Sequence, residues 1–286
     1  MSASVHAAGR MSMRRRTRSR VIEGLCIFAT IIGLLLLASI LVTLIVNGIG
    51  GMHWTVFTRM TSSPGEGGGL LNAIVGSVIQ AGLGTLVGTP IGLLVGTYLS
   101  EYGRTSALGN AVRFVSDILL SAPSILIGLF VYRLLVAPAG GYSGWAGVVA
   151  LSLIVIPIVV RTTEDMLRLI PTTLREAAVA LGAPKYQAII KVCYRAAADG
   201  IATGILLAIA RVAGETAPLL FTSLGNLNWS VDLTQPMASL PVTIYNYATS
   251  AFSDWVQLGW VGALLITMGV LALNILARLI VREERN

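Results

Sequence analysis

The sequence has few charged residues and very few histidines, and both shortages restrict what the protein can be. Charged residues make up 12% of the chain, about half of the roughly 25% that is usual in soluble domains. So few charges cannot cover a water-soluble globule of 286 residues, which excludes a soluble enzyme. The two histidines, His6 and His53, lie outside the apolar runs, which removes most zinc and haem sites.

Motifs that bind nucleotides or perform nucleophilic catalysis are also missing. A P-loop needs a Gly-Lys-Ser/Thr segment, but the only lysines, Lys185 and Lys191, do not follow a glycine. The chain is therefore not expected to hydrolyse ATP by that route. No nucleophile–base constellation lies within the apolar runs, which disfavours a membrane enzyme. The two cysteines, Cys26 and Cys193, do not make a disulfide framework and are interpreted as small buried residues.

Long apolar runs dominate the sequence, since hydrophobic residues make up 55% and the mean hydropathy is +0.80. A membrane-crossing helix takes about 20 residues, and the fourth run reaches that length only with the small residues before it. The first run is too long for a signal-peptide core and no small-residue cleavage site ends it, so it is interpreted as a retained helix. We predict an all-α polytopic membrane protein with six transmembrane helices, at 21–46, 70–99, 112–136, 145–160, 199–222 and 256–280.

Basic residues indicate the orientation of these helices. Nearly all of the 20 lysines and arginines fall in the N-terminal tail, the second and fourth connections and the C-terminal tail. The first connection holds Arg59 alone, and the third and fifth hold none. Positive charge gathers on the cytoplasmic side of membrane proteins. Both termini are therefore expected to be cytoplasmic, with an even number of spans.

Small residues in the second predicted span share one face of a helix. Glycines four residues apart allow two helix backbones to approach closely, because packing drives helix association in lipid. Pro90 in the same span is expected to kink it. We therefore expect this face to pack against another helix through Gly76, Gln80, Gly84, Gly88, Gly92 and Gly96.

Part of the fourth connection, 171–195, carries signals for a helix, a corner and a second helix. Thr173 and Glu176 have the spacing of a capping box, which predicts a helix start. Gly182 suits the left-handed position after a helix, and Pro184 suits the first turn of the next helix. On spacing alone, the segment is either an ordinary amphipathic loop or an element that transmits force from a soluble partner.

The same connection resembles a known family. Glu176-Ala177-Ala178, followed by Gly182, resembles the EAA loop of ABC importer permeases. In that family the loop forms a coupling helix that docks into a groove on the ATPase subunit. Many members continue with Leu-Pro where this chain has Tyr194-Arg195, so the resemblance is to a branch without that proline. It implies that coupling to an ATPase involves Thr173, Arg175, Glu176, Ala177, Ala178 and Gly182.

Several other segments extend the resemblance. The sequence RVAGETAPLL, from Arg211 to Leu220, is similar to a segment in the permease subunits of the high-affinity phosphate importer. Four further segments resemble its PstA-type subunit, at 121–125, 235–236, 240–245 and 273–278. The resemblance covers about 70–282 and implies the type I ABC importer permease (MetI-like) architecture. The expected organisation is a basic cytoplasmic tail at 1–20, a first transmembrane helix and external loop at 21–69, the permease domain at 70–282 and a cytoplasmic C-terminus at 283–286.

Arg211 and Glu215 are the candidate substrate-path residues. An arginine at the centre of a span costs about 2.5–3.5 kcal/mol on insertion scales, so Arg211 should face a partner or a water-filled cavity. Glu215 lies one helical turn on and can reach the guanidinium. The pair either neutralises itself and fixes helix packing, or lines a path for phosphate, which the planar guanidinium fork suits.

Other charges in the predicted spans are expected to be structural. Arg113 and Asp117 are spaced for an ion pair within the third span. Arg133 lies near the outer end of that span, where it can extend towards the membrane surface.

The resemblance implies a transmembrane permease subunit of an ATP-driven phosphate importer in a bacterial cell membrane. Such a subunit is not itself an enzyme and holds no cofactor, since ATP is bound by the partner ATPase. The implied partners are a second homologous permease subunit, cytoplasmic ATPase subunits, an external phosphate-binding protein, inorganic phosphate and the lipid bilayer, but no nucleic acid. Two alternatives stay open: an ABC permease for another oxyanion such as sulfate or molybdate, and an ion-coupled secondary transporter or channel.

Overall fold

The computed structural model describes the backbone of residues 2–283 and the side chains of Arg15 and residues 18–275. Every element within these residues is a helix, which confirms the predicted all-α class. The predicted C-terminal tail, 283–286, lies outside the described residues except for its first member. The elements are α1 (Ser2–Gly50), α2 (Thr55–Thr58), α3 (Leu71–Glu101), α4 (Ala107–Ser121), α5 (Ser124–Val131), the π-helical turn η1 (Tyr132–Val136), α6 (Ala137–Ala139), α7 (Gly144–Arg168), α8 (Thr172–Ala180), α9 (Lys185–Gln187), the π-helical turn η2 (Ala188–Cys193), α10 (Tyr194–Ala213), α11 (Ala217–Thr222), α12 (Leu240–Ala248) and α13 (Ser253–Glu283).

Five of the described helices are long and apolar enough to cross a membrane, and a bent helix pair brings the number to six. The first and last predicted windows lie within α1 and α13, and the second window begins one residue before α3 and otherwise lies within it. The fourth window, 145–160, is long enough to span the membrane because α7 continues beyond it to Arg168. The small residues before the window add only Gly144. These windows were predictable because each is one uninterrupted apolar run.

The third predicted window, 112–136, is wrong as a single straight helix. Its two halves belong to α4 and to α5 with its continuation, which meet at a bend of 106°. The bend falls at Ala122, whose backbone is extended (φ −66°, ψ 135°). The following Pro123 is the physical cause, since the residue before a proline is pushed out of the helical region.

The fifth predicted window, 199–222, is shifted and interrupted. The helix that contains its first half begins earlier, at Lys185, and runs to Ala213. Residues 214–216 then break the path before α11 begins. Arg211 therefore lies in the last turn of α10 and not at the middle of a continuous span.

The glycine face of α3 packs directly against α7, as predicted. A Cβ atom added at each of four glycines would lie only 2.6–2.9 Å from the Cβ atom of an α7 side chain. Such short separations leave room for nothing larger than hydrogen, so α3 and α7 are held as one tightly packed pair. Pro90 lies within α3, which stays helical throughout its length. The facing pairs are Gly84 and Leu151, Gly88 and Val155, Gly92 and Val159, and Gly96 and Thr163.

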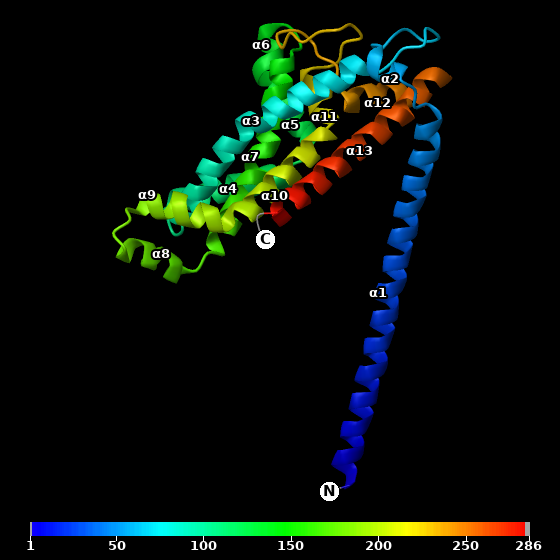
Figure 1. Ribbon diagram of the computed structural model, residues 1–286. Coiled ribbons are helices and arrows are strands. Elements are labelled where there is room, and N and C mark those ends of the chain that lie inside the picture. Colours follow the sequence, from blue (N-terminus) through cyan, green and yellow to red (C-terminus); the bar gives the residue numbers. More distant parts are fainter. Residues whose placement is uncertain (1, 284–286) are drawn as a thin grey trace.

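The bundle has two distinct ends, and α1 stands apart from it (Figure 1). α8 and α9 lie at one end, beside the end of α3, whereas α2, α6 and α12 lie at the opposite end. α1 contacts α13 near Gly48 and Gly51, where added Cβ atoms would lie 2.7–2.8 Å from Gln257, Val261 or Leu264. Most of the apolar side chains of α1 between Val21 and Ile49 are exposed. α1 begins at the bottom of the view and α13 ends at about the height of α8, so both of these helix ends point away from α2, α6 and α12.

The two cysteines differ in their surroundings. Cys193 is buried in the core cluster near the end of α7, in agreement with the expectation for it. Cys26 is exposed on α1, so its expected burial is wrong for this chain taken alone. The reason is that α1 lies away from the bundle over most of its length.

Candidate functional site

Arg211 and Glu215 lie together where α10 ends. The Nε atom of Arg211 is 3.3 Å from Oε1 of Glu215, which confirms the predicted reach between the two side chains. Arg211 has 57% of its side chain exposed, whereas only 11% of the Glu215 side chain is exposed. The carboxylate is thus set into the helix break, and the guanidinium is presented at the surface of the bundle. Such a guanidinium can still donate hydrogen bonds to an anion.

The bend between α4 and α5 lies against the same arginine. A small cavity of about 70 Å³ is lined by Arg211, by Ala122 at the bend and by Ser124 at the start of α5, among others. The free N–H groups at a helix start carry partial positive charge and attract anions. Residues Ile154, Pro157 and Ile158 supply the α7 wall of this cavity, with Leu119, Leu120 and Ile127 completing it. The bend that sequence analysis missed is therefore part of the candidate site.

Arg161 is a further exposed charge that sequence analysis did not single out. Its Nε atom lies 3.1 Å from Asp165 on α7, and its Nη1 atom lies 3.6 Å from Asp117 on α4. All three side chains are about half exposed. Arg161 follows Ile158 of the cavity by one helical turn. The i,i+4 spacing of Arg161 and Asp165 was the available signal, but the arginine was interpreted only as a mark of orientation.

The predicted ion pair between Arg113 and Asp117 does not form. The Nε atom of Arg113 instead lies 2.7 Å from Oε1 of Glu164, a buried carboxylate of α7 that also pairs with Arg168 at 2.6 Å. Asp117 faces Arg161. Arg113 points towards the bundle because its guanidinium also donates to the carbonyl oxygens of Leu99 and Gly103, close to the end of α3. Partners distant in sequence thus replace the nearest local one.

The start of α8 differs from the predicted capping box. The helix begins at Thr172, after Pro171, and no side chain caps it. Thr173 therefore already lies inside the first turn, where its hydroxyl is not placed to accept from the helix start. Pro171 (φ −58°, ψ 143°) explains the shift, because its ring fixes a backbone angle suited to entering a helix. Thr173 and Glu176 are both exposed.

The corner after α8 forms as predicted. Gly182 has a φ of +84°, the left-handed conformation that glycine adopts without steric cost. Pro184 directly precedes α9. Within α8, Ala177 is exposed, Ala178 is half-buried, and Arg175 is turned inward with 16% of its side chain exposed. The structure therefore brings most of the predicted coupling residues to one end of the bundle, but it separates Arg175 from the exposed ones.

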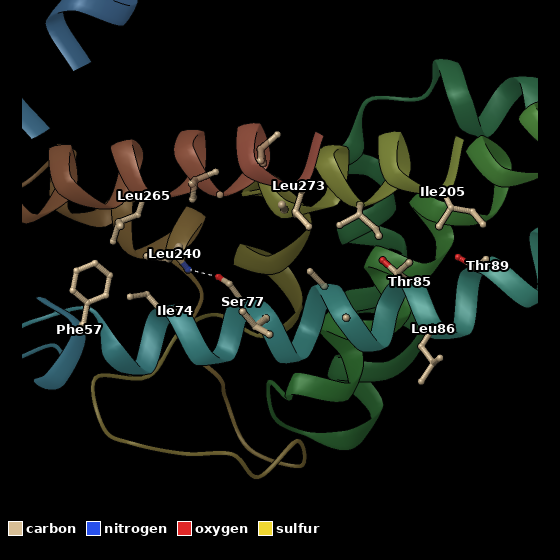
Figure 2. A pocket seen from close by; sticks show the side chains of 18 of the residues that line it. Phe57, Ile74, Ser77, Thr85, Leu86, Thr89, Ile205, Leu240, Leu265 and Leu273 are labelled. Atoms are coloured by element: carbon tan, nitrogen blue, oxygen red, sulfur yellow. Dashed lines mark hydrogen bonds between the residues drawn. The ribbon is translucent and has the colours of Figure 1, made fainter. Parts of the chain in front are cut away.

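A large apolar hollow in the described part of the chain does not have Arg211 among its lining residues (Figure 2). It measures about 770 Å³ and lies between α3 on one side and α10 and α13 on the other. Ser77 accepts a 2.7 Å hydrogen bond from the backbone N–H of Leu240 there, and the hydroxyl of Thr85 has no partner. None of its lining residues is charged. An anion therefore finds no counter-charge in this hollow, which excludes it as the candidate anion site.

The glycine-rich segment before α3 is tied to α13 at the end of the bundle opposite α8. Asp254 accepts a 2.6 Å hydrogen bond from the N–H of Gly65. The indole of Trp255 donates to the carbonyl of Ser62 at 3.2 Å. The loop before α3 is thus held by specific contacts, and a second long loop at this end, 223–239, joins α11 to α12. In the second loop, the hydroxyl and N–H of Thr234 lower the pKa of Asp232 below its ordinary value.

Residues 88–286 match the family of binding-protein-dependent transport system inner membrane components. The chain belongs to this family. Among curated importer permeases, the phosphate transport system permease protein PstA of Haemophilus influenzae is 55% identical over 95% of this chain and 96% of that protein. The corresponding protein of Yersinia pestis is 54% identical over 95% of this chain and 92% of its own length.

A more distant relative shows the same relationship. PstA 1 of Mycobacterium tuberculosis is 36% identical over 94% of this chain and 89% of that protein. The chain is therefore a member of the PstA group of importer permeases, which confirms the resemblance drawn from Arg211 to Leu220 and from the segments around it.

Solved structures of importer permeases share the fold. A chain of the MetNI methionine ABC transporter in an inward-facing conformation matches with a TM-score of 0.63 at 21% identity, covering 75% of this chain and 95% of that one. A chain of an amino acid ABC transporter matches with a TM-score of 0.58 at 15% identity, covering 75% and 93%. The predicted type I ABC importer permease architecture is confirmed. Like these permeases, the chain is a multi-pass membrane protein.

Proposed function

We propose that this chain is the transmembrane permease subunit of an ATP-driven phosphate importer. It forms part of the path for inorganic phosphate and couples that path to a cytoplasmic ATPase. The names of its close relatives support the substrate, since those proteins are phosphate transport permeases. The observation that carries the proposal is the exposed guanidinium of Arg211, paired with the largely buried carboxylate of Glu215 at a helix break.

The exposure of Arg211 restricts what this face of α10 can contact in a membrane. A half-exposed arginine cannot face hydrocarbon without a cost of several kcal/mol, so this face of α10 turns towards water or another subunit. We infer that a second homologous permease subunit covers it and that phosphate passes between the two. Phosphate then replaces Glu215 as the partner of the guanidinium, and Glu215 takes the guanidinium back when phosphate leaves.

The ATPase is expected to bind at the end of the bundle that carries α8. Leu174, Val179 and Leu181 expose 41%, 54% and 89% of their surface there, which leaves apolar area for a soluble partner. The sequence carries no P-loop, so ATP is bound and hydrolysed by that partner rather than by this chain. The permease itself then needs no cofactor.

The remaining assignments follow from the distribution of basic residues. Both termini and α8 are proposed to lie in the cytoplasm of a bacterial cell, with the chain in its inner membrane. The opposite end, with the loops around Trp54 and Trp229, is proposed to receive an external phosphate-binding protein. These two tryptophans are 79% and 47% exposed, as expected either for docking residues or for anchors at the membrane surface.

The test uses the assembled importer, with its partner subunits, in cells that lack other phosphate uptake. Arg211→Gln should assemble normally and abolish uptake of radiolabelled phosphate. Arg133→Gln is the matched control, because Arg133 is also an exposed arginine but does not line the Arg211 cavity. Undiminished uptake by correctly assembled Arg211→Gln importer contradicts the proposed path.

Two competing functions are separated by simple additions to this assay. Excess sulfate or molybdate that suppresses uptake as strongly as phosphate does would favour another oxyanion. Flux through the purified chain alone, without ATPase subunits or ATP, would favour an ion-coupled secondary transporter or channel. We expect neither result.

A further inference from the structure

Arg175 is the one predicted coupling residue that points into the protein. Its Nη2 atom lies 2.8 Å from Oε1 of Glu101, whose side chain is only 5% exposed. The same guanidinium donates at 2.5 Å to the carbonyl oxygens of Leu167 and Ile170, at the end of α7. One side chain of α8 therefore binds both the end of α3 and the end of α7.

Lys185, which lies after the corner at Gly182, also binds the end of α3. Lys185 follows Gly182 and donates at 2.9 Å to the backbone carbonyl of Glu101. Its Nζ atom also lies 4.0 Å from the ring centroid of Tyr102. That carbonyl belongs to the last turn of α3, where carbonyl groups lack helical partners and attract cations. The helix–corner–helix segment is thus fastened to the end of α3 before and after its corner.

The end of α3 leads directly to the candidate anion site. α3 is one helix that packs against α7 through its glycine face, from Gly84 to Gly96. α7 in turn supplies Pro157 and Ile158 to the cavity that Arg211 lines. A displacement of α8 that is passed to Glu101 therefore moves a tightly packed helix pair that forms one wall of this cavity.

We propose that Arg175 is a positioning residue that fastens α8 to α3 and α7 and transmits the motion of a bound ATPase to the bundle. The inference rests on the proposed function, because it assigns the force to an ATPase bound at α8. Arg175 thus keeps the coupling role expected for it and acts from inside the bundle, whereas the exposed residues around Leu181 form the docking surface. Glu101 supplies the carboxylate on α3 to which Arg175 is bound.

The test compares five variants of the complete importer complex: Arg175→Met, Glu101→Gln, the double variant, Leu181→Asp and Arg175→Lys. The first three should retain the ATPase on purification, while phosphate uptake per ATP hydrolysed falls about tenfold, within the range usual for coupling between sites. The double variant should fall no further than the single ones, because the two side chains act as one unit. Arg175→Lys should retain part of the coupling, since one ammonium can still pair with Glu101. Leu181→Asp should instead lose the ATPase.

Two results obtained with the importer complex would overturn the inference. One is loss of ATPase binding in Arg175→Met but not in Glu101→Gln, which would return Arg175 to the docking surface. The other is a double variant whose loss of coupling equals the product of the two single losses. Amide hydrogen exchange of 172–180 in the purified chain gives a readout that does not depend on transport. It should quicken in both single variants even if the proposed substrate or function is wrong, and unchanged exchange in both would refute the fastening itself.

Discussion

Arg211 and Glu215 meet across the break between α10 and α11, with Nε of the arginine 3.3 Å from Oε1 of the glutamate. The glutamate is nearly buried and the arginine is more than half exposed. The negative member of the pair is therefore fixed in place, and the positive member is free to bind elsewhere. This asymmetry is what a temporary binding place for an anion requires.

Glu215→Gln should slow phosphate release more than phosphate capture. Without the carboxylate, phosphate has no competitor for the guanidinium, so we expect KM to fall and kcat to fall about tenfold. Uptake kinetics over a range of phosphate concentrations measure both quantities. A higher KM with unchanged kcat would show that Glu215 assists binding instead, and the switching role would then be wrong.

Arg161→Gln is expected to reduce uptake several-fold without preventing assembly. Arg161 lies one helical turn beyond the Arg211 cavity and is shared between Asp117 and Asp165, which makes it a second exposed cation beside the proposed path. Arg195→Gln is the control, because Arg195 is exposed on α10 outside that cavity. Equal uptake by both variants in the transport assay would leave Arg161 with a structural role only.

Glu164→Gln should destabilise the bundle. Glu164 is 3% exposed and pairs with both Arg113 and Arg168, so its neutralisation leaves two cations without their partner. Removal of one member of a buried ion pair costs about 3–5 kcal/mol, and we expect a value near the lower end. Thermal unfolding in detergent measures the change. Asp165→Asn, a half-exposed neighbour, should cost about 1 kcal/mol or less.

Gly88→Leu should destabilise the α3–α7 contact, whereas Gly82→Leu in the same helix should not. A Cβ atom at Gly88 would lie 2.8 Å from Val155, but nothing lies within 4 Å of a Cβ atom at Gly82. Overpacking of this kind costs about 1–3 kcal/mol. The comparison of the two melting temperatures isolates the packing effect, since the change in side chain is identical. Similar melting temperatures would mean that α3 and α7 separate easily.

The sequence predicted those features that depend on local patterns. Apolar runs located the spans, because a helix in lipid must satisfy its own backbone. The glycine spacing in α3 predicted a close helix contact, and Gly182 predicted a corner, because each depends on backbone geometry at that residue. The pairing of Arg211 with Glu215 was also local, at one helical turn.

Features that depend on distant residues were not predictable in this way. Arg113 has Asp117 one turn away, yet it binds Glu164, because α4 packs beside α7. Arg175 looked like part of an exposed motif, but the end of α3 supplies a buried carboxylate for it. The bend at Ala122 did have a local signal in Pro123, which the surrounding apolar run outweighed in the interpretation.

The 106° bend between α4 and α5 exposes main-chain groups as well as side chains near Arg211. Carbonyl oxygens at the end of one helix and amide hydrogens at the start of the next are left without helical partners beside Arg211. Hydrocarbon accommodates such groups poorly, so we expect them to face water or other parts of the protein. If phosphate passes Arg211 as proposed, part of what it meets there is main chain, and substitutions of single side chains leave that part of the path intact.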